Sequence, residues 1–450
     1  MKLTLHQYKF YIKQILTIAS PIIISQIGTQ LTSIFDTIMV GHVSSTHLGA
    51  AAVANYLYLI PFLFGLGLSI GITPIVGQAN GAGKIDEVKN LFVDSIYFSI
   101  INAVFITVIM LIIGLFIPYL NFDKEITELA IPYYNWISIS FIAISLLGGF
   151  KQYLDGIELT IYGMLATIIG NIFNIFLNWV LIFGKLGAPK LELTGAGIAT
   201  CISRFISFLF ILLIVLYSKK LKNKIKRPRL KLFALKKLKD IYKTGINIGT
   251  QYALEMSAFS FIGIMTAWIG TIEIAAYNIT QNLVTLFYLG ITGIAAANTI
   301  IISNYIGNNN KKNVVESSYC MLLVTILITI CSVIIIYSTR NILPYVYTND
   351  IEVLKIVPIL LTFAALFHIP DAIAGSILGI LRGFINVKVP TLIQTISYWA
   401  FMIPFIYIIS FKLNFGVYGV TFGLVIGIGI CCIALYLWYR YILKQYLKNN

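Results

Sequence analysis

The segment SQIGTQLTSIFDTIMVG (25–41) is otherwise strongly apolar but contains several polar side chains, among them the carboxylate of Asp36. When the residues are placed at 100° intervals around a helix, the polar ones fall within an arc of about 160°, with large apolar residues opposite. A helix surrounded by lipid would not carry such a face. We therefore expect one side of this helix to line a polar crevice, with Gln26, Gln30 and Ser33 beside Asp36.

Two further carboxylates lie within apolar segments. Glu255 follows Asn247 and Gln251 at spacings of four residues, which places all three on one helix face. Asp371 directly follows Pro370, whose ring and missing N–H disturb a helix. An ionisable side chain near the centre of a bilayer costs about 3 kcal/mol, so it needs a partner, water or a function.

Of the 17 acidic residues, we expect these three to lie within the membrane and the others in loops or at span ends. Desolvation in general raises the pKa of a carboxyl group, which allows such a group to exchange a proton for a cation. The alternative is a permanently protonated acid that only makes an interhelical hydrogen bond.

A stripe of amides occupies another apolar segment. Thr167, Asn171, Asn174 and Asn178 follow one another at helical spacing on one face. Asparagine side chains in a helix bundle often hold neighbouring helices together through hydrogen bonds. For Asn171 this structural role and a role in ion coordination are both open.

The amino-acid composition indicates whether the segments that carry these residues are surrounded by water or by lipid. Of 450 residues, 58% are hydrophobic and 11% are charged, whereas a soluble domain has about 25% charged residues. A helix of about 20 apolar residues crosses a bilayer. The sequence therefore predicts an all-α integral membrane protein.

Twelve stretches are long enough to span. The first is longer than a signal peptide and lacks a small-residue cleavage site, so we expect it to remain in the protein. The predicted spans are 14–40, 48–74, 91–118, 131–153, 161–184, 195–217, 242–268, 274–302, 315–338, 356–381, 389–411 and 417–440.

The distribution of Lys and Arg predicts the orientation. With the N-terminus inside, the inner segments hold 25 of the 32 basic residues and the outer loops 6, and Arg204 lies within a span. By the positive-inside rule both termini are expected in the cytoplasm, and the protein in the plasma (inner) membrane. Twelve basic residues gather in 219–243, which explains much of the net charge of +15 without a nucleic-acid partner.

This basic segment divides the chain into two similar halves of six spans each. At an offset of 225 residues, Gln26 aligns with Gln251 and Gly65 with Gly290, and GQANGAGKIDEVKN (77–90) resembles the later loop 304–317 in position. Such a weak repeat is typical of transporters built from two related bundles. We expect two pseudo-symmetric six-helix bundles: an N-lobe (1–217), a basic cytoplasmic linker (218–241) and a C-lobe (242–450).

The remaining reactive residues do not predict an enzyme. The five cysteines lie in apolar spans without metal-binding spacing, and the four histidines are scattered. For His368, a hydrogen-bonded interior role is favoured over a proton relay. HExxH and similar catalytic motifs do not occur, so we expect neither catalysis nor a cofactor.

At this level of detail the chain resembles a known family. The run P21-x4-Q26-x9-D36-x2-M39-x-G41, then LGAAAVAN (48–55), PDAIAGSILGILRG (370–383) and NIFNIFLNWVLIFGKLGAP (171–189), is similar to the signatures of MATE (multidrug and toxic compound extrusion) transporters of the MOP superfamily. An acid at both Glu255 and Asp371, with Asn at 178, is most similar to the NorM-type branch.

The resemblance implies two cation sites, one of which lacks a ligand that is common in the branch. Phe367 stands where a Tyr is common in that branch, so a hydroxyl ligand is absent there. The implied N-lobe site for Na⁺ or a proton is Asp36, Asn174, Asn178 and Thr200, and the implied C-lobe ion or substrate site is Glu255, Tyr288 and Asp371, with Na⁺ expected at Asp36, Asn174 and Asn178 or at Glu255 and Asp371.

The resemblance also implies export of lipophilic organic cations by a monomer, through alternating access between two lobes, driven by inward Na⁺ or H⁺ flow. Carboxylates among aromatic side chains favour such substrates independently. The residues do not decide between the two coupling ions. A flippase of lipid-linked oligosaccharides from the same superfamily is the alternative, although its pyrophosphate substrates would require several cations in the cavity.

Overall fold

The computed structural model describes residues 4–219, 221, 223–225 and 235–448, and within these ranges every regular element is helical. The first half contains α1 (Leu5–Gly41), α2 (Ser45–Ile70), α3 (Ile72–Gly81), α4 (Ile85–Gly114), η1 (Ile117–Tyr119), α5 (Lys124–Gly156), α6 (Thr160–Phe183) and α7 (Glu192–Tyr217). The second half contains α8 (Leu235–Ile269), α9 (Thr271–Gly307), α10 (Lys311–Thr339), η2 (Leu343–Val346), α11 (Ile351–Gly383), α12 (Lys388–Ile396), η3 (Ser397–Met402), α13 (Ile403–Tyr407), η4 (Ile408–Lys412) and α14 (Gly416–Lys448).

All twelve predicted spans are confirmed as helices long and apolar enough to cross a membrane. The second span consists of α2 and α3, and the eleventh contains two π-helical turns, η3 and η4. Large apolar side chains such as Phe105, Leu213, Ile334 and Ile433 are more than half exposed. A lipid environment accounts for this exposure, which would be unfavourable in water.

The two predicted inner loops are mainly helical, and the turns within them match. Only residues 82–84 and 308–310 lie outside helices. Gly83 and Asn309 have left-handed backbone angles, with φ of 68° and 51°. In each turn the next residue donates its N–H to a carbonyl five residues back, over 3.2 Å and 3.1 Å. Equivalent turns in the two halves support the internal repeat.

The packing divides the chain at positions other than the predicted lobe boundaries of 217 and 242. One compact unit, here called the N-unit, comprises Ile24–Ala253, and the other, the C-unit, comprises the residues up to Ile23 together with those from Leu254 onward. Helices α1 and α8 therefore each begin in one unit and end in the other. The predicted linker 218–241 lies partly outside the described residues, and its last residues from Leu235 are already helical.

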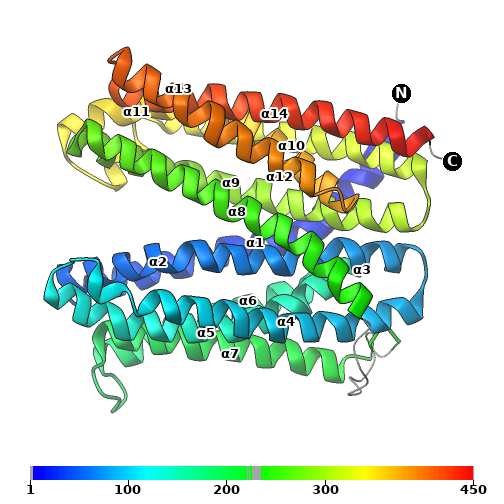
Figure 1. Cartoon of the computed structure of the whole chain (residues 1–450), viewed down its shortest axis with the longest axis horizontal. Coiled ribbons are helices and arrows are strands. Elements are labelled where there is room, and N and C mark those ends of the chain that lie inside the picture. Colours follow the sequence, from blue (N-terminus) through cyan, green and yellow to red (C-terminus); the bar gives the residue numbers. More distant parts are fainter. Residues whose placement is uncertain (1–3, 220, 222, 226–234, 449–450) are drawn as a thin grey trace. The chain divides into compact units, whose positions relative to one another are not determined.

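Within the N-unit, α5 packs against α2, α4 and α7, and α6 packs against α7 (Figure 1). The first part of α8 packs closely on α2 and α3 through two pairs of glycines. A Cβ atom on Gly67 would lie 2.5 Å from the Cα of Gly249, and one on Gly71 would lie 2.7 Å from the backbone nitrogen of Gly245. Small residues four positions apart allow two helices to approach this closely in a membrane.

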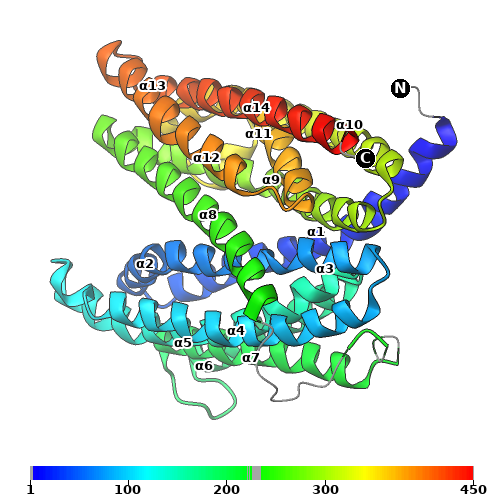
Figure 2. The same cartoon turned by 45° about the vertical axis from the view of Figure 1, so that its right-hand side comes forward.

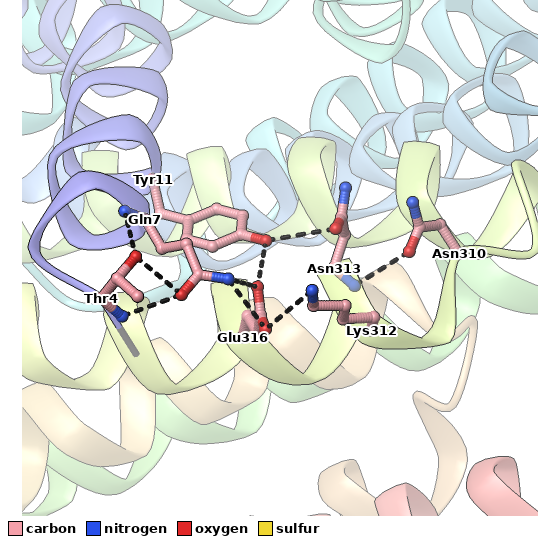
Figure 3. A network of polar contacts seen from close by, with 7 residues as sticks. All are labelled: Thr4, Gln7, Tyr11, Asn310, Lys312, Asn313 and Glu316. Atoms are coloured by element: carbon pink, nitrogen blue, oxygen red, sulfur yellow. Dashed lines mark hydrogen bonds and ion pairs between the residues drawn. The ribbon is translucent and has the colours of Figure 1, made fainter. Parts of the chain in front are cut away.

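Within the C-unit, α9, α10, α11 and α14 enclose a continuous apolar core, and these helices run side by side in yellow-green to red in Figure 2. The first turns of α1 contribute Tyr11, Ile15 and Ile18 to this core. At its rim, side chains of α1 reach the buried Glu316 of α10 (Figure 3).

Candidate functional site

The N-unit site begins where the polar face of α1 meets the asparagine stripe of α6. The side-chain nitrogen of Asn178 donates hydrogen bonds to Oδ1 of Asp36 and, over 3.1 Å, to Oδ1 of Asn174. Asn174 in turn donates to the hydroxyls of Thr200 at 3.3 Å and Ser203 at 3.4 Å on α7. The structure thus brings together all four residues that the sequence implied for this site and adds Ser203.

The oxygen atoms of the N-unit site are suited to a small cation. Asn178 is fully buried, and its Oδ1 has no hydrogen-bond partner among the residues that the structure describes. An unpaired buried acceptor is costly. A hard cation such as Na⁺ prefers carboxylate, amide and hydroxyl oxygens. Asp36, Asn178 and Thr200 provide one oxygen group of each kind, so these residues fit the implied ion.

The other polar residues of α1 are less uniformly placed than the sequence predicted. Gln26 and Gln30 are half-buried, whereas Ser33 is exposed. The hydroxyls of Thr29 and Thr32 donate to carbonyls of their own helix, over 3.0 Å and 2.9 Å. Such bonds satisfy the hydroxyls within the helix, so these two residues are less suited to hold a ligand.

Asn171 lies against α1 at a point where only a small residue fits. A Cβ on Gly28 would lie 3.0 Å from the Asn171 amide nitrogen, and this nitrogen has no partner in the described part of the chain. On α8, the Asn247 amide donates to the carbonyl of Lys243 over 2.7 Å, and Gln251 is buried. Of these residues, Asn171 is the one whose free donor faces α1.

The C-unit site is built around Glu255, near the middle of α8. Its carboxylate accepts a hydrogen bond from Gln394 of α12. Asp371 of α11 is close enough to Glu255 for the two carboxylates to interact electrostatically, and both act on Tyr398 in the π-helical turn η3. π-helical turns within α-helices are frequent at functional sites. The sequence gave no indication of Gln394 or Tyr398.

Tyr288 of α9 completes this site. Its hydroxyl would lie 3.2 Å from a Cβ on Gly375, one helical turn after Asp371, and its ring makes an edge contact of 6.4 Å with that of His368. Phe367 points into the apolar core with 3% exposure. Helix α11 continues through Pro370 without interruption, so the disturbance expected there is not a break.

Three of the acids that the sequence placed in loops or at span ends lie in helices and have little contact with the surroundings. Asp94, Asp155 and Glu316 are also buried, at 7%, 4% and 3% exposure. Each lies near one end of its predicted span, on a helix that extends beyond that end. Among the described residues, three or more His, Cys, Asp or Glu side chains do not gather into a metal site.

Comparisons with known proteins agree on the type of protein that this chain resembles. A family model described as MatE matches it twice, over residues 21–180 and 248–408. The two matches lie one in each half, as expected for an internal repeat.

Among similar proteins, "Multidrug resistance protein NorM" of Photobacterium profundum is 28% identical over 98% of both chains. "Probable multidrug resistance protein NorM" of Listeria monocytogenes serovar 1/2a is 30% identical over 94% of this chain and 93% of its own. The similarity thus covers nearly the whole length of each protein.

Solved structures with the same fold include the eukaryotic MATE transporter AtDTX14, with a TM-score of 0.88, 19% identity and coverage of 98% and 99%. An outward-facing multidrug resistance MATE family transporter of the MOP superfamily has a TM-score of 0.90 at 22% identity, with 97% of each chain covered. At these identities the likeness concerns the fold.

Proposed function

The chain belongs to the MatE family, and from this premise we propose that it is a multidrug antiporter that exports lipophilic organic cations in exchange for Na⁺ or H⁺. Its relatives that are named multidrug resistance proteins support the class of substrate. In this proposal the protein works as a monomer in the plasma membrane, with both termini in the cytoplasm, by alternating access between its two bundles.

The observation that carries the coupling is the hydrogen-bonded chain from Asp36 through Asn178 and Asn174 to Thr200. It joins the single carboxylate of the N-unit site to neutral oxygen atoms and leaves the Asn178 oxygen without a partner among the described residues. When the coupling ion binds there, it neutralises the carboxylate and pairs this oxygen. Either Na⁺ or H⁺ removes the negative charge of Asp36.

The C-unit site supplies the features that recognise an organic cation. Glu255 and Asp371 lie close together, and aromatic rings surround them, with Phe259 and Tyr398 in edge contact at 6.0 Å. Carboxylates attract a lipophilic cation, and ring faces stabilise it after it has lost its water. Ion binding from outside reduces the total negative charge and so weakens the hold on the drug, which leaves outward.

The coupling ion is tested in proteoliposomes that contain the purified protein. Uptake or release of ethidium is followed under a Na⁺ gradient alone and under a pH gradient alone. Drug movement driven by either gradient identifies the ion. If neither gradient moves ethidium, antiport is excluded.

The role of the acids is tested in cells by ethidium efflux from Asp36→Asn and Glu255→Gln variants. Both are expected to lose most of the efflux at equal expression, because each retains the shape of the side chain and loses its charge. Asp86→Asn is a matched control, since Asp86 is exposed at the start of α4. Unchanged efflux in both site variants would remove the proposed role of these acids.

The flippase alternative predicts a different ligand. A pyrophosphate group needs several cations that converge on it, whereas Arg204 and Arg382 belong to different units. Displacement of bound ethidium by a lipid pyrophosphate, but not by tetraphenylphosphonium, would favour the flippase.

A further inference from the structure

Arg204 lies near the middle of α7 and is held in place by groups from two other helices. Its Nη1 donates hydrogen bonds of 2.7 Å to the hydroxyls of Tyr58 on α2 and Ser140 on α5. Ser140 is fully buried and Tyr58 is 6% exposed. Because an arginine side chain remains charged at all physiological pH values, this arrangement fixes a permanent cation inside the N-unit.

The Arg204 guanidinium also covers aromatic rings. Its central carbon lies 5.7 Å from the ring centre of Tyr58 and 5.6 Å from that of Phe62, and these two rings stack at 4.9 Å. Contacts within about 6 Å of a ring centre are typical of cation–π interactions. An organic cation that used the same ring faces would have to displace the guanidinium.

Arg204 and Asp36 are close enough to interact electrostatically. Thr200 precedes Arg204 by one helical turn and accepts one of the two hydrogen bonds that link α7 to the Asp36 chain. The charges of Arg204 and Asp36 act on each other and both act on Tyr133. The two side chains do not form an ion pair within 4 Å in the part of the chain that the structure describes, so Arg204 does not neutralise Asp36 by direct contact.

The two units therefore differ in the charge that they present. In the N-unit, Arg204 balances Asp36. In the C-unit, two carboxyl groups, those of Glu255 and Asp371, lie near one guanidinium, that of Arg382, whose charge acts on Glu255. Both units contain an acid and aromatic rings, but carboxyl groups outnumber arginines at these groups only in the C-unit.

We propose that Arg204 is a tethered cation that occupies an aromatic cation site in the N-unit, so that organic cations bind through the C-unit and Asp36 is reserved for the coupling ion. This inference rests on the proposed function and names the unit that binds the substrate. Arg204 acts as a specificity-determining residue, because its charge and its position on the rings exclude a second organic cation. An Arg204→Gln change would remove both the charge and the contact with the rings.

The test is equilibrium dialysis of tetraphenylphosphonium against the purified full-length protein in Na⁺-free buffer. The wild type is expected to bind one molecule, and Glu255→Gln combined with Asp371→Asn to bind none. Arg204→Gln is expected to bind two, and Arg204→Gln combined with Asp36→Asn to return to one. Arg204→Lys keeps the charge and is expected to bind one, an outcome that a loss of packing alone would not produce.

Folding of each variant is checked by gel filtration and thermal denaturation. If folded Arg204→Gln binds only one molecule, the inference is overturned. A second measurement does not depend on this variant: Asp36→Asn alone is expected to keep the single site of the wild type, and loss of that site would also overturn the inference. Failure of the proposed function is a separate outcome, in which the wild type binds no tetraphenylphosphonium.

Discussion

Glu316 on α10 accepts a hydrogen bond of 2.8 Å from the hydroxyl of Tyr11 on α1, a residue 305 positions earlier in the chain. The Gln7 amide donates to the same carboxylate over 3.3 Å, and Lys312 lies 3.9 Å from it (Figure 3). Because Glu316 is almost fully buried, these donors replace water around its charge. The contact fixes the first turns of α1 to the C-unit.

Removal of the Tyr11 hydroxyl is therefore expected to destabilise the protein. In Tyr11→Phe the buried carboxylate loses its shortest hydrogen bond, which costs about 1.5–3 kcal/mol when the acceptor is charged. Thermal denaturation in a mild detergent should show a lower midpoint than for the wild type. Tyr8→Phe, one turn earlier on the same helix, is the control and should change the midpoint little. Equal effects of the two variants would show that the hydroxyl of Tyr11 is not important.

The contact between α8 and α2 predicts a strong effect of a single methyl group. In Gly249→Ala the added Cβ would lie 2.6 Å from the backbone oxygen of Phe64, so the helices must separate. Overpacking of this kind costs about 1–3 kcal/mol. Gly263→Ala, on the same helix, is a matched control because a Cβ there has no described atom within 4 Å. Denaturation midpoints should fall for Gly249→Ala and stay constant or rise for Gly263→Ala.

Replacement of Asn178 should change the coupling ion or abolish coupling. In Asn178→Asp a second carboxylate faces Asp36, and two acids in contact do not ionise independently, so they retain a proton. Proteoliposome transport should become more dependent on the pH gradient and less dependent on Na⁺. Asn178→Leu removes the free oxygen, and transport should fall at least tenfold.

Asn171→Leu serves as the control for these variants, since Asn171 lies on the same face of α6 outside the hydrogen-bonded chain. It should keep the ion dependence of the wild type. If Asn171→Leu and Asn178→Leu lose transport equally, the asparagine stripe has only a structural role.

Because Gln394 donates a hydrogen bond to Glu255, we expect substitutions at these two positions to have non-additive effects on transport. In Gln394→Leu the Glu255 carboxylate loses a donor and is no longer held in one orientation, so the half-saturating ethidium concentration should rise about tenfold, which corresponds to about 1.4 kcal/mol. The double variant with Glu255→Gln should be no worse than Glu255→Gln alone, because the two residues act through one hydrogen bond. Additive losses would contradict this connection.

The sequence and the family resemblance predicted the helices and the grouping of Asp36, Asn174, Asn178 and Thr200, because these signals are local or shared with a family. An apolar stretch long enough to cross the bilayer must be helical there, because lipid offers no hydrogen-bond partners to its backbone. The family resemblance assigned Asp36 and Asn178 to one site, although they are 142 positions apart in the chain. Gln394 and Tyr398 could not be found in this way, because they lie in an apolar span and acquire a role only where that span approaches α8.

The units of packing could not be predicted either. Composition and the basic segment place the division near residue 218, but the first turns of α1 contribute Tyr11 and Ile15 to the core of the C-unit. The apolar face of those turns is similar to that of many helices, and nothing in the local pattern specifies the partner. Glu316 was placed at the end of a span for a related reason: α10 begins before its apolar stretch.

The assignment of residues up to Ile23 to the C-unit also has a consequence for biogenesis. The partner of these residues, Glu316, is synthesised about 300 residues after them, which takes about 15–60 s at ~5–20 residues per second. During that interval the N-terminal turns of α1 must remain in the translocon, in lipid or with a chaperone. The first turns of α1 therefore reach their final packing only after α10 has been inserted.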